Sequence, residues 1–531
     1  MSESNKPAMS RRQLFSLIGS VAGSAVMYEA MSTLAYAAES KFDGPIKLSG
    51  DPKGASVIIL GSGLAGMVAA HELGKAGYKV QILEYQDRAG GRNWSIQGGD
   101  TYTELGGFTQ HCEFDKGLYI NPGPWRIPYH HHGILHYCQE LGVAMQPFVQ
   151  VGYNTFVHST KAFGGKPQRY RHIAADFQGY TAELLAKSTQ QAKLDQMVTK
   201  EDQEVLLQAM RQWGALDRNY EYKKGPRVSD RRGFDKDPGG GLTARPIDSE
   251  PLGMQEVFKS GLWASVAAGV GYEFQNTLFQ PVGGMGMIGK AFGAKLGPII
   301  QYNSKVIEIK QDASGVTVTY VDAKAGGPPR TVRADWCVNT IPASVLSQIP
   351  MSVGAPMRAA INALSYGASI KVGLQFKRRF WEEDEKIYGG ISYTDQPNSM
   401  ISYPSTDYFS KGKGVLLGAY GFGPNAYRYS AMSPEERIKK TVEYGSKIHP
   451  QYPVEFENGV SVAWHRVPWT LGCAGSWTEA LRAQHYDNMC ALDGRIILAG
   501  EHASYIPAWQ EGAVTSSLDA IGRLHQRVMA G

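Results

Sequence analysis

One stretch near the N-terminus restricts the fold of this 531-residue chain more than any other. Residues 55–86 read ASVIILGSGLAGMVAAHELGKAGYKVQILEYQ, which is an apolar run, a glycine-rich turn, a segment with helical spacing and a second apolar run. A continuous apolar strand is buried on both faces, and two such strands joined by a helix form a parallel βαβ unit. We therefore predict an α/β fold that opens with a strand at 57–60, a helix at 64–75 and a strand at 78–83.

The glycine turn predicts a dinucleotide site. Gly61, Gly63 and Gly66 form the pattern G-x-G-x-x-G between the strand and the helix. The first glycine allows the tight turn, the second lets the backbone approach a pyrophosphate, and the third lets helix and strand pack closely. Glu84 ends the second strand, where an acidic side chain bonds ribose hydroxyls. A glycine-rich turn without a ligand is the alternative, and the flanking strand, helix and acidic residue favour binding.

Composition excludes several classes of protein. Hydrophobic residues make up 43% of the chain, charged residues 19%, and the net charge is +5, which is typical of a globular protein with two or three domains. No polybasic run is present, so we expect neither a nucleic-acid nor an anionic-membrane partner. No later apolar stretch is long enough to span a membrane. The five cysteines are odd in number and contain no C-x-x-C, so neither a disulfide framework nor a zinc site is indicated. A homo-oligomer is possible, and the sequence leaves the oligomeric state open.

The first 37 residues resemble an export signal. Arg11 and Arg12 precede a weakly apolar run, and Ala35-Tyr36-Ala37 forms a candidate A-x-A cleavage site. The pattern resembles a twin-arginine signal, which predicts a periplasmic or secreted protein. A disordered tail or an amphipathic helix is the alternative.

Three further motifs carry a family resemblance. The R-x-G-G-R pattern comprises Arg88, Gly90, Gly91 and Arg92, a second block is Glu104-Leu105-Gly106-Gly107, and LAGEHAS near the C-terminus contains Gly500 and Glu501. In combination they resemble the flavin-dependent amine oxidase family over most of residues 55–525, and the chain is closest in type to the L-amino-acid oxidases. The resemblance implies FAD as the cofactor. The residues expected to bind it are Gly61, Gly63, Gly66, Glu84, Arg92, Val306, Gly500 and Glu501.

The resemblance also implies how FAD is attached. Cys473 falls where monoamine oxidases bind FAD covalently, but the aromatic residue that follows there is Ala474 in this chain. We therefore expect FAD to be bound without a covalent link.

The predicted fold class is α/β with three parts. A discontinuous Rossmann-like FAD-binding domain takes residues 51–125, 280–345 and 487–531. A mainly helical domain spans 126–279, and a strand-rich substrate-binding domain spans 346–486.

Lys371 is the predicted catalytic residue. It lies in SIKVGLQFKRRFW, which resembles the family segment whose lysine hydrogen-bonds a water next to the flavin. A lysine on a buried strand needs a partner or a function, and a surface lysine on an edge strand is the alternative. The resemblance places Trp509 at the substrate face of the flavin, whereas Trp464 and Trp469 are equally consistent with core packing.

Arg126 is the predicted ligand of a substrate carboxylate. It lies in NPGPWRIP, a short loop that three prolines stiffen. The segment GPWRIP resembles the stretch whose arginine binds the substrate carboxylate in L-amino-acid oxidases. Two alternatives remain. Thr109 could occupy the position of the carboxylate-binding arginine, or Arg126 could pair with a nearby carboxylate of the protein and have a structural role. Tyr403, in SMISYPSTDYF, is the candidate for a second hydrogen bond to the same carboxylate.

The adjacent His130, His131 and His132 suggest a metal site at first sight. Neighbouring histidines at the start of a helix point in different directions and cannot share one ion well. We therefore predict no metal.

The favoured function is an FAD-dependent L-amino-acid oxidase, which converts an amino acid, oxygen and water to a 2-oxo acid, ammonia and hydrogen peroxide. The alternatives are a monoamine or polyamine oxidase, an amino-acid monooxygenase that makes an amide, and a flavoprotein chaperone or binding module. The sequence does not indicate the preferred amino-acid side chain.

Overall fold

A computed structural model of the chain describes residues 40, 42–191, 198–242 and 245–531. The proposed signal at 1–37 lies outside these ranges, so export stays a prediction. Within them, no helix combines the length and the apolar content that crossing a membrane requires.

The central sheet has six strands in the order β12-β2-β1-β16-β23-β22. The strands are β12 (Ile300–Gln301), β2 (Lys79–Leu83), β1 (Ser56–Leu60), β16 (Trp336–Asn339), β23 (Ile496–Leu498) and β22 (Leu492–Asp493). The first five pair in parallel and β22 pairs antiparallel with β23. They come from three distant segments of the chain, so the predicted discontinuous α/β fold is confirmed.

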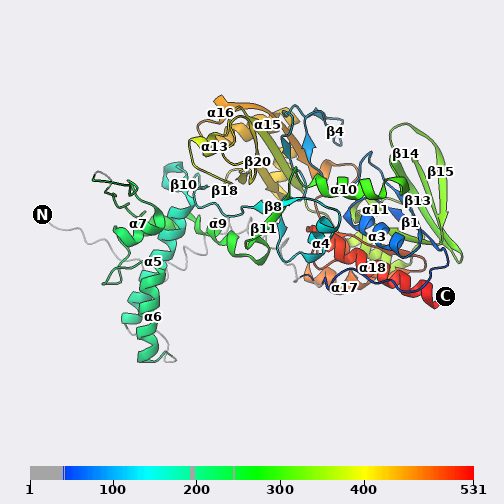
Figure 1. Ribbon diagram of the computed structural model, residues 1–531, viewed down its shortest axis with the longest axis horizontal. Helices are drawn as coiled ribbons and strands as arrows, with labels where there is room; N and C mark the ends of the chain where they lie inside the picture. The colour runs from blue at the N-terminus through cyan, green and yellow to red at the C-terminus, as the bar shows by residue number, and fades with distance from the viewer. Residues whose placement is uncertain (1–39, 41, 192–197, 243–244) are drawn as a thin grey trace.

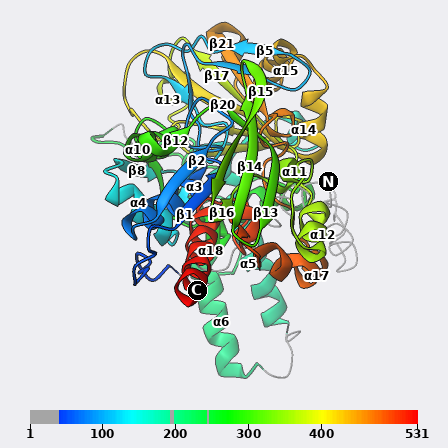
Figure 2. The same cartoon turned by 90° about the vertical axis from the view of Figure 1, so that its right-hand side faces the viewer.

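Both faces of this sheet are covered, as the apolar run in β1 requires. Val57 and Ile59 belong to one core with helices α3 (Leu64–Lys75), α10 (Gly286–Leu296) and α18 (Gln510–Ala530). Ile58 and Leu60 belong to a second core. That core is shared with β13 (Ser304–Asp312), β14 (Gly315–Asp322), β15 (Gly326–Ala334), α11 (Ala343–Leu346), α12 (Ala355–Ala363) and α17 (Glu479–Cys490). Figure 2 looks onto this end of the molecule, where β13, β14 and β15 lie over the central sheet.

A seven-stranded sheet forms the second part, in the order β10-β9-β18-β19-β20-β17-β21. Its strands are β10 (Gln168–Arg169), β9 (Phe156–His158), β18 (Ile391–Thr394), β19 (Met400–Ser402), β20 (Gly414–Phe422), β17 (Ser369–Phe376) and β21 (Phe456–Ala463). All eight residues of β17 are buried, and β17 lies between β20 and β21, which excludes an edge strand there. Helices α13 (Phe380–Glu383), α14 (Gly423–Ser430), α15 (Pro434–Gly445) and α16 (Tyr452–Glu455) accompany this sheet.

The part of the chain predicted to be mainly helical contains strands as well as helices. Helices α5 (Tyr170–Gln190), α6 (Lys200–Trp213) and α7 (Pro226–Arg232) extend from the end of the molecule opposite β14 and β15 (Figure 1). The segment also contains α4 (His132–Glu140), α8 (Met254–Ser260), α9 (Trp263–Ala267) and the short helix η3 (Tyr272–Phe274). A three-stranded sheet of β7 (Ile127–Pro128), β11 (Leu278–Pro281) and β8 (Met145–Phe148) joins its two ends. Its β9 and β10 belong to the seven-stranded sheet, and the exact domain bounds stay a prediction.

Candidate active site

One cavity of about 670 Å³ lies where the central sheet meets the seven-stranded sheet. Its lining includes Gly61, Glu84 and Thr340, each of which directly follows the carboxyl end of a parallel strand, and Gly500, which lies two residues beyond the end of β23. Ligands of open α/β sheets bind at this edge. Nine of the predicted site residues line the cavity: Gly61, Gly63, Glu84, Arg92, Arg126, Val306, Gly500, Glu501 and Trp509. Gly66, Lys371 and Tyr403 do not.

The three glycines of the turn have different reasons for lacking a side chain. Gly61 has φ of 103°, which favours glycine. A Cβ on Gly66 would lie 2.0 Å from the carbonyl oxygen of Gly61, so the third glycine is required by helix–strand packing. A Cβ on Gly63 would meet nothing within 4 Å and this residue lines the cavity. The space beside Gly63 is therefore available to a ligand.

Glu84 is buried at the end of β2. Its carboxylate accepts hydrogen bonds from the Ser62 amide (2.6 Å), the Ser62 hydroxyl (2.8 Å) and the Gln86 amide (2.7 Å). Burial raises its pKa, and these donors oppose that shift. The bonds fix the carboxylate at the cavity wall, where its remaining lone pairs can accept from ribose hydroxyls.

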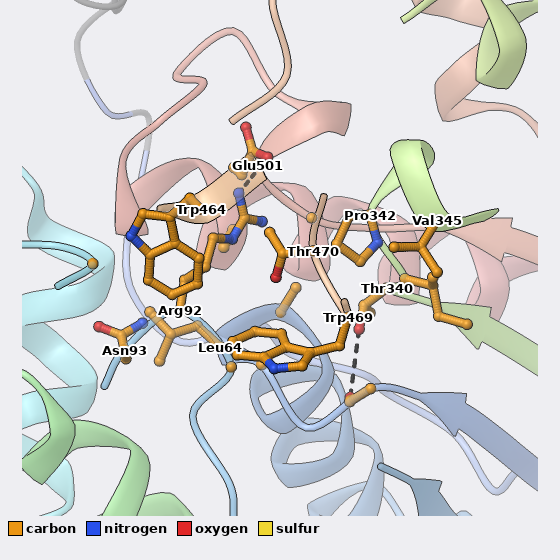
Figure 3. Close-up of a pocket in the computed structure, with 18 of the residues that line it drawn as sticks. Leu64, Arg92, Asn93, Thr340, Pro342, Val345, Trp464, Trp469, Thr470 and Glu501 are labelled. Carbon is orange, nitrogen blue, oxygen red and sulfur yellow. Dashed lines mark hydrogen bonds and ion pairs between the residues drawn. The ribbon is translucent and has the colours of Figure 1, made fainter. Parts of the chain in front are cut away.

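The half-buried Arg92 and the buried Glu501 form an ion pair on the wall, and Figure 3 shows the arginine extended toward the carboxylate. Arg92 Nη1 lies 2.8 Å from Glu501 Oε1 and donates to the Cys473 carbonyl at 2.6 Å. Burial pushes the pKa of Glu501 upward, but Arg92 overrides it and the net shift is downward. Both groups are therefore charged, and Arg92 keeps further N–H groups that can donate to a cofactor.

The cavity is continuous from Glu84 and Val306 at one end to Arg126 and Trp509 at the other. An extended ligand with a phosphate-bearing centre matches the glycine turn, the Glu84 carboxylate after β2 and the Arg92 guanidinium. The residues present therefore fit FAD. Cys473 also belongs to the lining of this cavity, and burial raises the pKa of its thiol, which disfavours the reactive thiolate.

Trp464 and Trp469 pack in the protein interior and also line the wall of the cavity. Trp464 is buried and donates from Nε1 to the Pro122 carbonyl at 2.7 Å. Its ring meets that of Trp469 edge to face, with centroids 5.7 Å apart, and both rings line the cavity (Figure 3). The two interpretations left open by the sequence are therefore compatible.

Arg126 lies at the far end of the cavity as a buried cation surrounded by rings. Its side chain is 7% exposed, and its guanidinium carbon lies 4.8 Å from the ring centre of Trp125, 4.6 Å from Phe274 and 5.8 Å from Trp509. Burial lowers its pKa, but a guanidinium stays protonated in proteins. Its Nε has no hydrogen-bond partner within the described ranges. The ion pairs of the nearby Glu273 run to His130 and His131 instead.

The structure separates two predicted residues from this end of the cavity. Thr109 lies exposed on β5 (Thr109–His111), which pairs with β4 (Thr101–Thr103), and its hydroxyl bonds that of Thr103 at 2.8 Å. Tyr403 is buried behind the wall, where its hydroxyl bonds Ser392 (2.7 Å) and His449 (2.5 Å). Because its hydroxyl is already engaged, Tyr403 is not placed to bind the same ligand as Arg126.

Sequence reasoning missed Tyr420 and Phe422. Both line the cavity at alternate positions of β20, with ring centres 4.5 Å apart, and Tyr420 packs against Trp125 at 5.3 Å. Alternate residues of a strand share one face, so two aromatics spaced by two were the available signal. No hydrogen bond of the Tyr420 hydroxyl is found in the part of the chain that the structure describes. It is therefore the better candidate for the second donor beside Arg126.

Lys371 lies directly behind the wall, on the buried strand β17. Its Nζ donates to the carbonyls of Gly123 (2.6 Å) and Asn121 (3.2 Å) and lies 4.4 Å from the ring centre of Tyr420. Burial lowers its pKa from 10.5 to about 7, and the charge of Arg126 adds to this. The amine can therefore gain or lose a proton near neutral pH.

Comparison with known proteins decides the family. The family described as flavin-containing amine oxidoreductase matches residues 64–523 of this chain. The chain belongs to this family. It is accordingly an oxidoreductase that acts on amines, with FAD as its cofactor.

Several relatives of this flavin amine oxidoreductase carry names. YobN of Bacillus subtilis (strain 168), provisionally named an L-amino-acid oxidase, is 28% identical over 87% of this chain and 93% of its own length. An L-amino-acid oxidase of Siganus canaliculatus is 28% identical over 89% and 86%. Among solved structures, cyclohexylamine oxidase from Brevibacterium oxydans IH-35A has TM-score 0.59 at 17% identity, covering 90% of this chain and 100% of that one. Wild-type putrescine oxidase bound to putrescine has TM-score 0.57 at 19% identity, covering 90% and 99%. At such identities the structural likeness shows the fold alone.

Proposed function

We propose that this flavoprotein is an L-amino-acid oxidase that converts an L-amino acid, oxygen and water to a 2-oxo acid, ammonia and hydrogen peroxide. The observation that supports the proposal is Arg126, a buried cation at the cavity wall that no acidic side chain of the described residues pairs with. A simple amine offers no group for it, whereas an amino acid does.

The energetics favour a carboxylate ligand. A buried charge without a partner is costly, and binding an anion offsets that cost. The planar guanidinium matches a carboxylate with two parallel hydrogen bonds, and each charge-assisted bond contributes about 1.5–3 kcal/mol. The hydroxyl of Tyr420, on the same wall, supplies a third donor. Small amines lack this anchor and would leave Arg126 unpaired.

The surroundings also favour an uncharged amino group. Arg126 and the ammonium form of Lys371 add positive charge at this end, so they disfavour a third cation and lower the pKa of a bound ammonium. Trp125, Phe274 and Trp509 enclose the guanidinium and exclude water. Bound FAD would supply the acceptor for the hydride of the substrate α-carbon and the route of the electrons to oxygen.

Lys371 is proposed to hold or release a proton at Nζ. It is fixed by the Asn121 and Gly123 carbonyls, and its lowered pKa makes both protonation states accessible. A proton source of this kind suits the step in which oxygen becomes peroxide. The same proposal includes export through residues 1–37, since peroxide is then made outside the cytoplasm.

The proposal is tested with pairs of molecules that differ only in the carboxylate. L-phenylalanine with 2-phenylethylamine, L-ornithine with putrescine, and L-leucine with 3-methylbutylamine are mixed anaerobically with the purified flavoprotein. Loss of flavin absorbance by at least one amino acid, and by none of the amines at a comparable rate, supports the proposal. Reduction by an amine as fast as by its parent amino acid contradicts it. Peroxide and 2-oxo acid, rather than an amide, must then appear in air.

A further inference from the structure

Behind the aromatic wall lies a cluster of ionisable groups that the proposed chemistry does not use. His130, His131 and Glu273 are each 1% exposed. Their candidate ligand atoms all lie within 4.8 Å of one another. His131 Nε2 lies 2.9 Å and His130 Nε2 lies 3.6 Å from Glu273 Oε2. Three titratable side chains so deeply buried require an explanation, because burial without compensation is unfavourable.

The contacts within the cluster do not satisfy its polar atoms. The Nε2 of His131 and both carboxylate oxygens of Glu273 lack a partner with hydrogen-bond geometry within the described ranges, and the His130 ring makes a backbone contact with Tyr272 that can satisfy only one of its two nitrogens. The large majority of buried side-chain polar atoms in proteins have such a partner, so several unsatisfied atoms at one place point to a missing ligand. That ligand must accept lone pairs from two imidazoles and one carboxylate together.

We propose that His130, His131 and Glu273 bind one divalent transition-metal ion, with Zn²⁺ as the best match. Two imidazoles and one carboxylate form a common zinc ligand set, and a water molecule completes the tetrahedron. Ligand atoms about 2.0–2.1 Å from zinc at tetrahedral angles lie about 3.3 Å apart. The measured separations of 2.9 and 3.6 Å bracket that value.

The local backbone explains why two adjacent histidines can share an ion, contrary to the expectation from sequence. Helix α4 begins at His132, so His130 and His131 precede it and are not bound to helical geometry. Their rings are nearly perpendicular, at 88°, with centroids 4.8 Å apart. His132, the third histidine of the run, is exposed and does not belong to the cluster.

The position of the ion gives it a structural consequence. His130 and His131 follow β7, and Glu273 precedes β11, so the ion links two chain segments that also carry Arg126 and Phe274. The His131 ring further contacts Trp509 at 5.2 Å. An ion there stiffens three sides of the cavity end.

Zinc content and thermal stability test the inference directly. Untagged protein is incubated with ZnSO₄, dialysed and analysed by inductively coupled plasma mass spectrometry. We expect about one zinc per chain for the wild type and for His132→Ala, the matched control, and at least a tenfold lower content for His131→Ala and Glu273→Gln. Zinc should raise the melting temperature of the first two proteins only.

A second measurement needs no variant. Co²⁺ added to the wild type should give d–d absorption at wavelengths beyond the flavin bands, with the intensity of a four-coordinate site, and Zn²⁺ should displace it. Flavin content reports whether each variant is folded. The inference is overturned if the wild type retains no zinc and gives no such cobalt spectrum, or if folded Glu273→Gln retains as much zinc as His132→Ala.

Discussion

Replacing Arg126 by methionine separates a substrate-binding arginine from a structural one. Methionine removes the charge and the donors but keeps an unbranched apolar side chain of similar length. If Arg126 binds the substrate carboxylate, the variant loses one partner of a buried charge pair, which costs about 2–5 kcal/mol. This free energy corresponds to a fall in kcat/KM for amino acids of about 30- to 4,000-fold.

The effect of Arg126→Met on stability should also differ from the effect of breaking a structural ion pair. Removing one partner of a buried ion pair destabilises a protein by about 3–5 kcal/mol. Arg126 has no such partner, so relief of its desolvation offsets the loss of its three ring contacts, each about 0.5–2 kcal/mol. We therefore expect the melting temperature of Arg126→Met not to fall.

The assay combines peroxide formation with thermal unfolding. Arg126→Lys keeps the charge without the planar fork and should retain part of the activity, whereas Arg330→Met, on the exposed strand β15, should behave as wild type. A variant Arg126→Met that unfolds at a much lower temperature, or that keeps wild-type kcat/KM for amino acids, would refute the reasoning.

Three further predictions concern the cofactor, the lysine and the second donor. Gly63→Ala should fold but retain little FAD, because its Cβ would occupy the space beside the turn, whereas Gly74→Ala on the same helix should retain FAD; the flavin-to-protein ratio checks both. The pKa of Lys371 is lower in the folded than in the unfolded chain, so the unfolded chain binds more protons between pH 7 and 10.5. The free energy of unfolding, measured by denaturant titration, should therefore rise over that range by up to about 1.4 kcal/mol per pH unit. Lys371→Met should abolish this rise. Parallel pH profiles of the wild type and the variant would contradict the low pKa. Tyr420→Phe should raise KM for amino acids about 2- to 10-fold, while Tyr403→Phe leaves KM unchanged; equal effects would show that the assignment of the second donor is wrong.

The parts of the fold that can be predicted from the sequence are those that depend only on residues close together in the chain. The apolar run in β1 fixes a strand buried on both faces, and Val57 and Ile58 indeed face different cores. The glycine turn and Glu84 follow within one βαβ unit, so their positions at one cavity could be predicted from local order alone. The position of Arg126 at the same cavity could likewise be expected from the stiff loop that carries it.

Residues that depend on strand register could not be placed in the same way. Tyr403 and Tyr420 both belong to the strand-rich part, and each could have turned a hydroxyl toward the substrate. The choice depends on β20 lying beside β17, so that Tyr420 pairs with Lys371, while Tyr403 follows β19 and faces His449. Likewise, His131 and Glu273 are separated by 142 positions, and only the pairing of β7 with β11 brings them together. Tertiary pairing of this kind is not encoded in any local pattern.

The most direct test of the account is a crystal structure of the FAD-bound protein with benzoate, a carboxylate that cannot be oxidised. We expect both carboxylate oxygens to lie about 2.7–2.9 Å from the guanidinium nitrogens of Arg126. The benzoate ring should pack among Trp125, Phe274 and Trp509. Benzoate bound elsewhere, with the Arg126 guanidinium turned to pair with Glu273, would contradict the assignment of an amino-acid substrate.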